Sequence, residues 1–363
     1  MRNIKHEDLY KLSSYFYRLP PEAIAQFPAS PRDSSRLLVW NVKENTILRE
    51  NIFRDITNFL RPNDLLVLND TKVIPARLKG VRESGGQCEI FLLKNLTSDF
   101  LTWEALVKPA RKIHKNAKIK IDDVFINILE ERDEGIREIK FDCNSREEFM
   151  NFLDKSGHVP LPPYIKNNND MREAYQTVFA RHDGSVAAPT ASLHFTPELL
   201  EKIKNIGVKI SYVTLHVGLG TFRPVKTLDI REHEIHTEHC ELPNETADLI
   251  KECKSRSGRV IASGTTAART LESFAKDGEI KTGFLDTNLY IYPGYKFKIV
   301  DALITNFHLP ESSLIMLVAA FAANKAKNFG HEEEILSQLL DIYEDCAENN
   351  WRFFSFGDAM FIN

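Results

Sequence analysis

The stretch Arg259-Val260-Ile261-Ala262-Ser263-Gly264-Thr265-Thr266-Ala267-Ala268-Arg269-Thr270-Leu271 has the pattern of a short apolar strand that passes through glycine directly into a helix. The same order recurs downstream, where a strand-like run at 297–307 precedes an apolar helical segment at 311–323. Upstream, Thr196-Pro197 is a typical helix start, and the strand-like run 208–217 follows that helix. Alternating strands and helices predict an α/β layered domain with a mostly parallel sheet.

Residues 63–144 have a different character, because nearly every window in them has the pattern of a short β-strand. Turn-forming residues separate these runs at 83–86, 97–99, 122–123 and 133–135. Many short strands at close spacing predict a small antiparallel β-barrel or sandwich. We expect the N-terminal segment to join the α/β domain, which makes the β-rich block an insertion. The predicted organisation is a discontinuous α/β domain at 1–61 and 152–363, with an inserted β-barrel domain at 62–151.

Composition is that of an ordinary globular protein, since 43% of the 363 residues are hydrophobic and 27% are charged. The five cysteines form no C-x-x-C pair, which argues against a disulfide framework and favours a reducing, cytoplasmic location. The N-terminal residues lack the apolar run of a secretory signal. The longest apolar stretch, 314–323, is about half of a membrane span. We therefore expect a buried helix there and no association with a membrane.

The net charge of −4 excludes a general electrostatic attraction of the whole molecule to nucleic acid. A local basic patch is present in the β-rich block, where 108–120 contains six Lys or Arg residues and no acidic residue. The residues expected to contact RNA phosphates are Lys108, Arg111, Lys112 and Lys115. The alternative is an exposed strand edge that lysine protects from pairing with other chains.

Polar residues follow three of the predicted strands at the point where each strand ends. They are His216, Gly218, Gly220, Thr221 and Arg223 after the first strand, Thr265 after the second, and Asn306 and His308 after the third. Ligands of α/β sheets bind outside the carboxyl ends of strands, so the three ends are expected to converge on one crevice. The alternative is that these residues cap helices or satisfy backbone groups, and Thr265 is a typical N-cap.

The segment 181–196 combines small residues, hydroxyl groups and a histidine without any periodicity, just before the helix start at Thr196. Small residues allow the backbone to approach a ligand closely, and a helix N-terminus attracts anions. Thr190 and His194 are therefore candidate site residues. A tight core loop that excludes larger side chains explains the same pattern equally well.

Other sequence motifs give weaker evidence about function. The chain contains no G-x-x-x-x-G-K-[ST] phosphate loop and no H-E-x-x-H motif. The spacing His233-x-x-His236-x-x-His239-Cys240 offers four zinc-type ligands. It is not a common ligand pattern, and its acidic neighbours favour a solvated strand or turn. No metal is expected.

Longer strings can be considered together. They lie at 19–26, 31–38, 66–78, 157–165, 175–181, 187–196, 213–225, 292–297, 301–309 and 352–360. In this order they resemble the S-adenosylmethionine:tRNA ribosyltransferase-isomerase family of queuosine biosynthesis. The chain departs from the family pattern at Ser192 (usually glycine), at Ala267-Ala268 (usually Ser-Val) and at His239-Cys240 (usually two tyrosines). None of these departures removes a candidate acid, base or arginine.

The resemblance implies a fold, an activity and partners. The fold is an α/β domain that carries a small β-barrel. The activity is transfer and isomerisation of the ribosyl unit of S-adenosylmethionine onto the aminomethyl group of 7-aminomethyl-7-deazaguanine in a tRNA anticodon. This gives epoxyqueuosine-tRNA and releases adenine and methionine. S-adenosylmethionine is the co-substrate, no metal is implied, and the partner is a tRNA with a GUN-type anticodon, bound by a monomer.

The resemblance also locates candidate residues. The sulfonium acidifies the protons on the ribose 5′-carbon, so that a general base can remove one, and the departing adenine needs a proton donor. The candidate catalytic residues are His194, His216, His308 and Asp301. The candidate substrate-binding residues are Asp70, Arg77, Arg181, Thr190, Gly218, Gly220, Thr221, Arg223, Thr265, Arg269 and Asn306. The arginines are candidates to hold the methionyl carboxylate or RNA phosphates.

Two other classes of function are weighed against this one. A non-catalytic RNA-binding module predicts loss of the histidines and arginines named above, and all of them are present. A Ser/His hydrolase would use Ser185 or Ser192 with His194, but the chain has no G-x-S-x-G nucleophile elbow.

Overall fold

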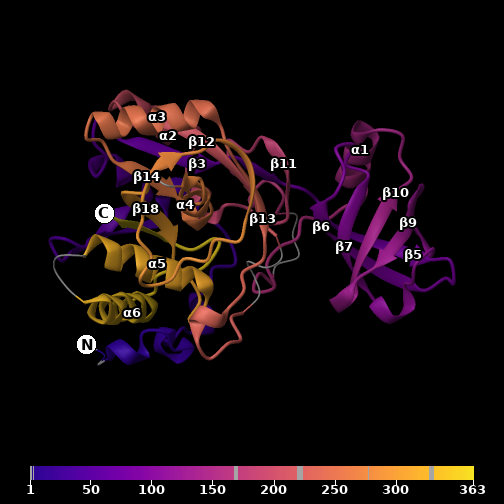
Figure 1. Cartoon of the computed structure of the whole chain (residues 1–363), viewed down its shortest axis with the longest axis horizontal. Coiled ribbons are helices and arrows are strands. Elements are labelled where there is room, and N and C mark those ends of the chain that lie inside the picture. The colour runs from indigo at the N-terminus through magenta and orange to yellow at the C-terminus, as the bar shows by residue number, and fades with distance from the viewer. Residues whose placement is uncertain (1, 3, 167–170, 219–223, 277, 327–330) are drawn as a thin grey trace.

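The computed structural model describes residues 2, 4–166, 171–218, 224–276, 278–326 and 331–363. Two bodies lie side by side: a large sheet with helices packed on it, and a separate barrel (Figure 1). Both chain ends belong to the larger body, so the barrel is formed by an internal part of the chain.

The large sheet contains nine strands in the order β17-β13-β12-β3-β14-β18-β19-β1-β2. In chain order these strands are β1 (Arg36–Asn41), β2 (Thr46–Ile52), β3 (Leu65–Asn69), β12 (Lys209–His216), β13 (Glu238–Leu242), β14 (Val260–Ser263), β17 (Gly283–Thr287), β18 (Ala302–Asn306) and β19 (Ala359–Ile362). The four central strands β12, β3, β14 and β18 run parallel to one another. Antiparallel pairs extend the sheet on both sides, so the expected mostly parallel sheet is a mixed one.

Helices cover both faces of this sheet. Successive residues of a strand point to opposite faces, and both faces carry apolar side chains that the helices bury. Leu65 and Val67 of β3 pack in the core that contains α3, α4, α5 and α6, whereas Leu66 and Leu68 pack in the core that contains α2. The helices are α2 (Pro197–Asn205), α3 (Asn244–Ser255), α4 (Gly264–Ser273), α5 (Ser313–Lys325) and α6 (Glu332–Glu348). The predicted α/β layered architecture is confirmed.

Helix α5 is apolar on all sides, and its residues 315–323 are all buried. This is the buried helix expected from the longest apolar stretch. In the part of the chain that the structure describes, no helix is both long and apolar enough to cross a membrane.

The second body is a closed antiparallel barrel of six strands, as predicted. Its strands are β5 (Arg77–Arg82), β6 (Gln87–Asn95), β7 (Thr102–Lys108), β8 (Lys118–Ile121), β9 (Val124–Glu131) and β10 (Ile136–Phe141). Alternate side chains point inward and fill the interior; Leu78, Ile90, Trp103 and Ile126 are fully buried. Helix α1 (Arg146–Ser156) follows the last strand and packs into the same core.

The start of the barrel differs from the expected boundary. The strand Leu65–Asn69, which the sequence pattern placed in the β-rich block, is β3 at the centre of the large sheet, between β12 and β14. All its residues are buried, as in a parallel strand covered on both faces. Its unbroken apolar run is the signal that separates it from the alternating barrel strands. The barrel begins at Arg77, and the N-terminal segment contributes β1 and β2 to the large sheet.

Short elements connect the two bodies and fill the edges. Strand β4 (Thr71–Val73) pairs in parallel with β11 (His182–Ser185) beside the barrel, and β15 (Ala275–Lys276) pairs with β16 (Glu279–Ile280). The 3-10 helices are His6–Asp8, Leu12–Tyr15, Pro21–Ala23, Arg32–Ser34, Phe53–Asn58, Ala110–Lys112, Asp133–Gly135, Thr190–Ser192 and Ile230–Glu232.

Candidate active site

A cavity of ≈ 400 Å³ lies at the carboxyl ends of β12, β14 and β18. We call it the strand-end cavity. The predicted residues that line it are Thr190, Thr265, Asn306 and His308, and Val217 joins them after β12. Aromatic rings of Tyr164, Tyr175 and Phe354 form another part of its wall. Its described lining residues include no Lys or Arg, and Glu311 is the carboxylate among them.

His308 lies in the wall of the strand-end cavity, with its Nε2 2.7 Å from the Oγ1 of Thr305. The hydroxyl of Tyr17 donates a hydrogen bond to the backbone carbonyl of His308 and so fixes its backbone. Burial lowers the pKa of His308 to about 3. The imidazole is therefore neutral at pH 7, with one nitrogen able to donate and the other able to accept.

His194 lies directly behind Asn306 and is not among the described residues that line the cavity. The Nδ2 of Asn306 lies 3.1 Å from the Nε2 of His194, and its Oδ1 accepts from Thr190 Oγ1 at 3.0 Å. The same Nδ2 lies 3.5 Å from the carbonyl oxygen of Asp358, which can only accept, so Nδ2 is the donor in both contacts. The Nε2 of His194 is then the acceptor, and its Nδ1–H donates to Ser35 Oγ at 2.8 Å.

The surroundings of His194 keep it neutral. Burial, with a smaller contribution from the positive charges of Arg352 and Arg32, lowers its pKa to about 3. Its ring stacks on Phe53 with 4.8 Å between ring centres. A neutral, immobile acceptor orients the amide of Asn306 in the cavity wall. This geometry suits a positioning role rather than direct contact with a substrate.

A second cavity, of ≈ 980 Å³, lies between the barrel and the large sheet. We call it the inter-body cavity. The barrel side contributes Lys94 and Phe100, and the sheet side contributes Arg181, His216 and Gly218. The two cavities border one short segment at the end of β12, which we call the junction: Val217 lines the strand-end cavity, and its neighbours His216 and Gly218 line the inter-body cavity. The single predicted crevice is thus a pair of adjacent cavities.

The His216 imidazole is held on two sides. Its Nδ1 lies 2.7 Å from Thr71 Oγ1, and a Cβ atom built on Gly184 would lie 3.1 Å from the ring. Burial, with smaller contributions from His239 and His182, lowers the pKa of His216 to about 4. Within the described residues its Nε2 makes no hydrogen bond. His216 is therefore a neutral imidazole, fixed in place, at the junction of the two cavities.

Asp70 and Arg181 lie near the same junction. Asp70 is almost completely buried and accepts a hydrogen bond from Thr214 Oγ1 at 2.8 Å, and His182 Nε2 lies 3.5 Å from its other oxygen. Burial raises the pKa of the Asp70 carboxyl. The guanidinium of Arg181 lies 4.9 Å from the ring centre of Tyr212. This stacking holds the guanidinium at the cavity wall, where its N–H groups can meet an anionic ligand.

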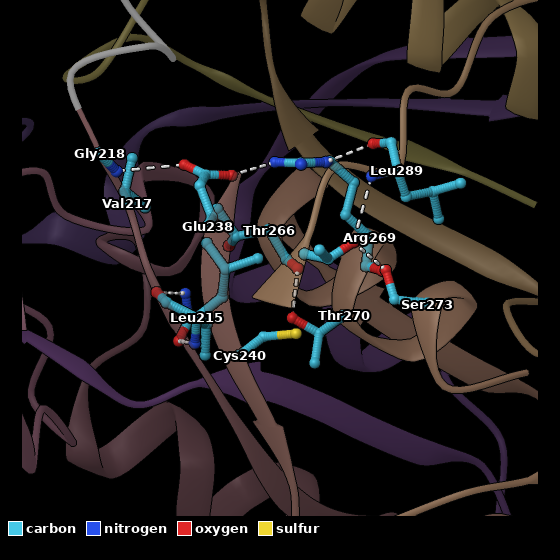
Figure 2. A network of polar contacts seen from close by, with 12 residues as sticks. Leu215, Val217, Gly218, Glu238, Cys240, Thr266, Arg269, Thr270, Ser273 and Leu289 are labelled. Atoms are coloured by element: carbon cyan, nitrogen blue, oxygen red, sulfur yellow. Dashed lines mark hydrogen bonds and ion pairs between the residues drawn. The ribbon is translucent and has the colours of Figure 1, made fainter. Parts of the chain in front are cut away.

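The side chain of Arg269 is buried and bonds to other groups of the protein (Figure 2). Its Nη1 donates to Oε2 of Glu238, and its Nε donates to the carbonyl of Leu289 at 3.0 Å. The Oε1 of Glu238 accepts from the backbone N–H of Gly218 at 3.1 Å. This buried pair anchors the chain where it leaves β12. Sequence reasoning missed Glu238, although its place on the inward side of the alternating strand β13 is a signal.

Several predicted residues lie elsewhere. Asp301 precedes β18 at its amino end, opposite to His308, and bonds Lys254 Nζ at 2.5 Å, so it does not meet the histidines. Arg77 begins the barrel, with its guanidinium 5.7 Å from the ring centre of Phe91. Gly220, Thr221 and Arg223 lie outside the described residues.

The basic segment lies on the barrel. Lys108 ends β7, Arg111 and Lys112 are in a 3-10 helix, and Lys115 lies 2.5 Å from Glu130 in an exposed ion pair. None of the four lines the described part of either cavity. Across the described ranges, no group of three or more His, Cys, Asp or Glu side chains is placed to hold a metal ion.

Known proteins match this chain over nearly its whole length. A family model described as "Queuosine biosynthesis protein" matches residues 12–362. The chain is 50% identical over 353 residues to the S-adenosylmethionine:tRNA ribosyltransferase-isomerase of Thermosipho africanus, with 97% of this chain and 99% of the relative covered. It is 47% identical over 369 residues to the protein of the same name from Syntrophomonas wolfei, with both chains fully covered.

A solved structure agrees with these relatives. The crystal structure of S-adenosylmethionine tRNA ribosyltransferase from Thermotoga maritima matches with a TM-score of 0.54 and 38% identity, over 97% of this chain and 100% of that chain. A sheet with cavities at its strand ends is the usual arrangement of an α/β enzyme that binds a small molecule. The chain belongs to the S-adenosylmethionine:tRNA ribosyltransferase-isomerase family of queuosine biosynthesis. The resemblance drawn from its sequence strings is confirmed.

Proposed function

We propose that this chain transfers and isomerises the ribosyl unit of S-adenosylmethionine onto the aminomethyl group of 7-aminomethyl-7-deazaguanine in a tRNA anticodon. The products are epoxyqueuosine-tRNA, adenine and methionine. The observation that carries the proposal is the match to relatives of this name over essentially the whole length of both chains. Two adjacent cavities support it, because the reaction joins a small co-substrate to a base that belongs to a large RNA.

In this proposal S-adenosylmethionine occupies the strand-end cavity. Its volume lies within the range of roughly 300–1,000 Å³ that is usual for small-molecule sites. The aromatic rings of Tyr164, Tyr175 and Phe354 suit a sulfonium cation or an adenine, since both interact favourably with the faces of aromatic rings. The modified base enters the inter-body cavity after leaving its stack in the anticodon loop.

His216 is the proposed general base. Its depressed pKa keeps the ring in the neutral form that accepts a proton, and Thr71 and Gly184 fix its orientation. It lies at the junction of the two cavities, where the ribose 5′-carbon must meet the acceptor amine. His308 and Asn306 are proposed to hydrogen-bond the ribose or the departing adenine from the wall of the strand-end cavity. His194 acts through Asn306 as a positioning residue.

The tRNA side of the proposal uses the barrel. The basic residues Lys108, Arg111, Lys112 and Lys115 are proposed to contact RNA phosphates while Arg181 contacts the anticodon near the inter-body cavity. A single chain supplies both cavities and the basic segment, which supports a monomer as the active form.

The decisive experiment measures adenine release. The chain is incubated with S-adenosylmethionine and a tRNA that carries the aminomethyl base at a GUN anticodon. Adenine and methionine should appear together with a tRNA nucleoside of the epoxyqueuosine mass, and tRNA with unmodified guanine should give neither. Methyl transfer, or no adenine with any tRNA, would contradict the proposal. Labelling of Ser185 or Ser192 by a fluorophosphonate would support the hydrolase alternative instead.

A further inference from the structure

Helix α4 begins at the strand-end cavity without a side-chain cap. Gly264, Thr265 and Thr266 of its first turn all line the cavity. The N-cap residue, Ser263, makes no cap hydrogen bond, because its hydroxyl lies 2.9 Å from the hydroxyl of Ser192 instead. The first N–H groups of a helix have no partner inside the helix and carry a partial positive charge. They are therefore available to a ligand here.

The neighbouring helix α5 shows the contrast. It also begins at the same cavity, but the Oγ of Ser312 accepts a hydrogen bond from the backbone N–H of Ile315 at 3.4 Å. In α5, therefore, a side chain of the N-cap residue binds one of the free backbone N–H groups of the first turn. The cavity thus has two helix N-termini, and only α4 lacks a side-chain cap among the described residues.

A second observation concerns the hydroxyl groups of α4. Thr265 is only 8% exposed and lines the cavity, and no described residue accepts from or donates to its hydroxyl. The Oγ1 of Thr266 is also buried without a hydrogen-bond partner. Buried polar side chains normally have hydrogen-bond partners, so the buried Thr265 side chain and the unpaired Thr266 hydroxyl, beside an uncapped helix, point to a bound group that is an acceptor. The alternative that Thr265 caps the helix does not hold, because Ser263 occupies the N-cap position.

The charges around the cavity identify the kind of group. The described lining residues include no Lys or Arg, so the α4 N-terminus is the positive pole among them. The candidate arginines that the structure describes lie elsewhere: Arg77 begins the barrel, Arg269 pairs with Glu238, and Arg181 lines the inter-body cavity. Among the described lining residues, the first turn of α4 is therefore the group best suited to stabilise an anion. The anionic group of S-adenosylmethionine is its carboxylate.

We propose that the first turn of α4, with the hydroxyls of Thr265 and Thr266, binds the methionyl carboxylate of S-adenosylmethionine. This inference rests on the proposed function, because it takes S-adenosylmethionine as the occupant of the strand-end cavity. It assigns to a helix N-terminus the role that sequence reasoning gave to arginine. It also fixes the direction of the ligand, since the methionyl end lies at α4 and the adenosyl end lies toward the remaining walls.

The test compares two ligands and two isosteric variants. Calorimetry without tRNA measures the Kd of S-adenosylmethionine and of its decarboxylated analogue, which lacks only the carboxylate. Wild type should bind S-adenosylmethionine at least about tenfold more tightly than the analogue. Thr265→Val should weaken S-adenosylmethionine about tenfold and leave the analogue nearly unchanged. Thr266→Val should act in the same sense, and Thr265→Ser should retain most of the affinity.

The matched control is Thr270→Val on the same helix, whose hydroxyl donates to the carbonyl of Thr266 and does not line the described part of the cavity. It should leave both affinities unchanged. Equal weakening of both ligands by Thr265→Val and Thr266→Val, or no weakening of either, would overturn the inference. An active wild type that binds both ligands equally would overturn it while leaving the proposed function intact. No binding and no adenine release by wild type would instead contradict the proposed function.

Discussion

Gly184 lies so close to His216 that a Cβ atom on the glycine would be 3.1 Å from the imidazole ring. The φ angle of Gly184 is +146°, a conformation that L-residues rarely adopt. On the other side, Thr71 Oγ1 lies 2.7 Å from Nδ1 of the same ring. The position of His216 therefore requires a residue without a side chain at 184, in the 181–196 segment.

Gly184→Ala should displace the imidazole of His216. Misplacement of a catalytic group by about 1 Å can cost roughly 100-fold in rate, so kcat for adenine release should fall by about 10- to 100-fold. The Kd of S-adenosylmethionine should change little, and His216→Asn should set the limit of the loss. Gly207→Ala is the control, because Gly207 also has a positive φ but lies beside Pro62, at the end of α2. An unchanged kcat in Gly184→Ala would remove His216 from the mechanism.

His194→Leu should remove the closer of the two acceptors of the Asn306 amide, so that one of its N–H groups loses its partner. An unsatisfied buried donor costs about 1–3 kcal/mol, and loss of the ring leaves a gap beside Phe53 as well. Urea denaturation should show a lower free energy of unfolding, and calorimetry should show weaker binding of S-adenosylmethionine. His194→Gln, whose side-chain oxygen can accept, should recover part of the binding. Equal binding by the two variants would show that the hydrogen bond does not orient Asn306.

Acid should destabilise the folded chain through its buried histidines. Burial lowers the pKa of His194 and His308 to about 3 and that of His216 to about 4, from an ordinary 6.5. Between these values and 6.5 the unfolded chain binds more protons than the folded chain, so stability rises with pH in this window and is lost as pH falls. Within this window each histidine lowers the free energy of unfolding by about 1.4 kcal/mol for each unit that the pH falls. Urea denaturation at about pH 7 and about pH 5 should show a smaller loss in His308→Gln than in wild type. Equal losses would contradict this assignment.

Arg269→Leu should strongly destabilise the protein. Removal of one partner from a buried ion pair costs about 3–5 kcal/mol, because the other buried charge loses a partner of opposite sign. The double variant Arg269→Leu with Glu238→Leu should recover part of that loss in the same urea denaturation measurement. The exposed pair Lys204–Glu201 is the control, and Lys204→Leu should change little. A single variant as stable as wild type would show that the buried pair does not anchor the end of β12.

Alanine at Lys108, Arg111 or Lys112 should weaken tRNA binding in a salt-dependent way. Each lost phosphate contact should reduce the slope of log K against log salt by roughly one. Lys115 should have a smaller effect, since it pairs with Glu130. Lys202→Ala, an exposed lysine on α2, serves as the control. If no variant on the barrel changes the slope, the RNA surface lies elsewhere.

From the rule that ligands bind at the carboxyl ends of strands, the sequence predicted that Thr265, Asn306 and His308 lie together, and all three line one cavity. The same rule failed to separate His216, because one residue along β12 decides which cavity a side chain faces. The rule does not apply to Asp301, because this residue precedes its strand rather than following it. Side-chain direction at the end of a strand depends on register, and register is set by neighbouring strands.

Periodicity and local propensity act within a few residues, and they fixed the alternation of strands and helices, the barrel pattern and the family strings. Contacts between residues far apart in the chain decided the rest. They placed β3 in the large sheet, turned Arg269 inward to Glu238 and put His194 behind Asn306. The physical reason is that burial and hydrogen-bond partners come from packing, which no local segment contains. Which side chain faces a cavity is therefore a property of the folded chain.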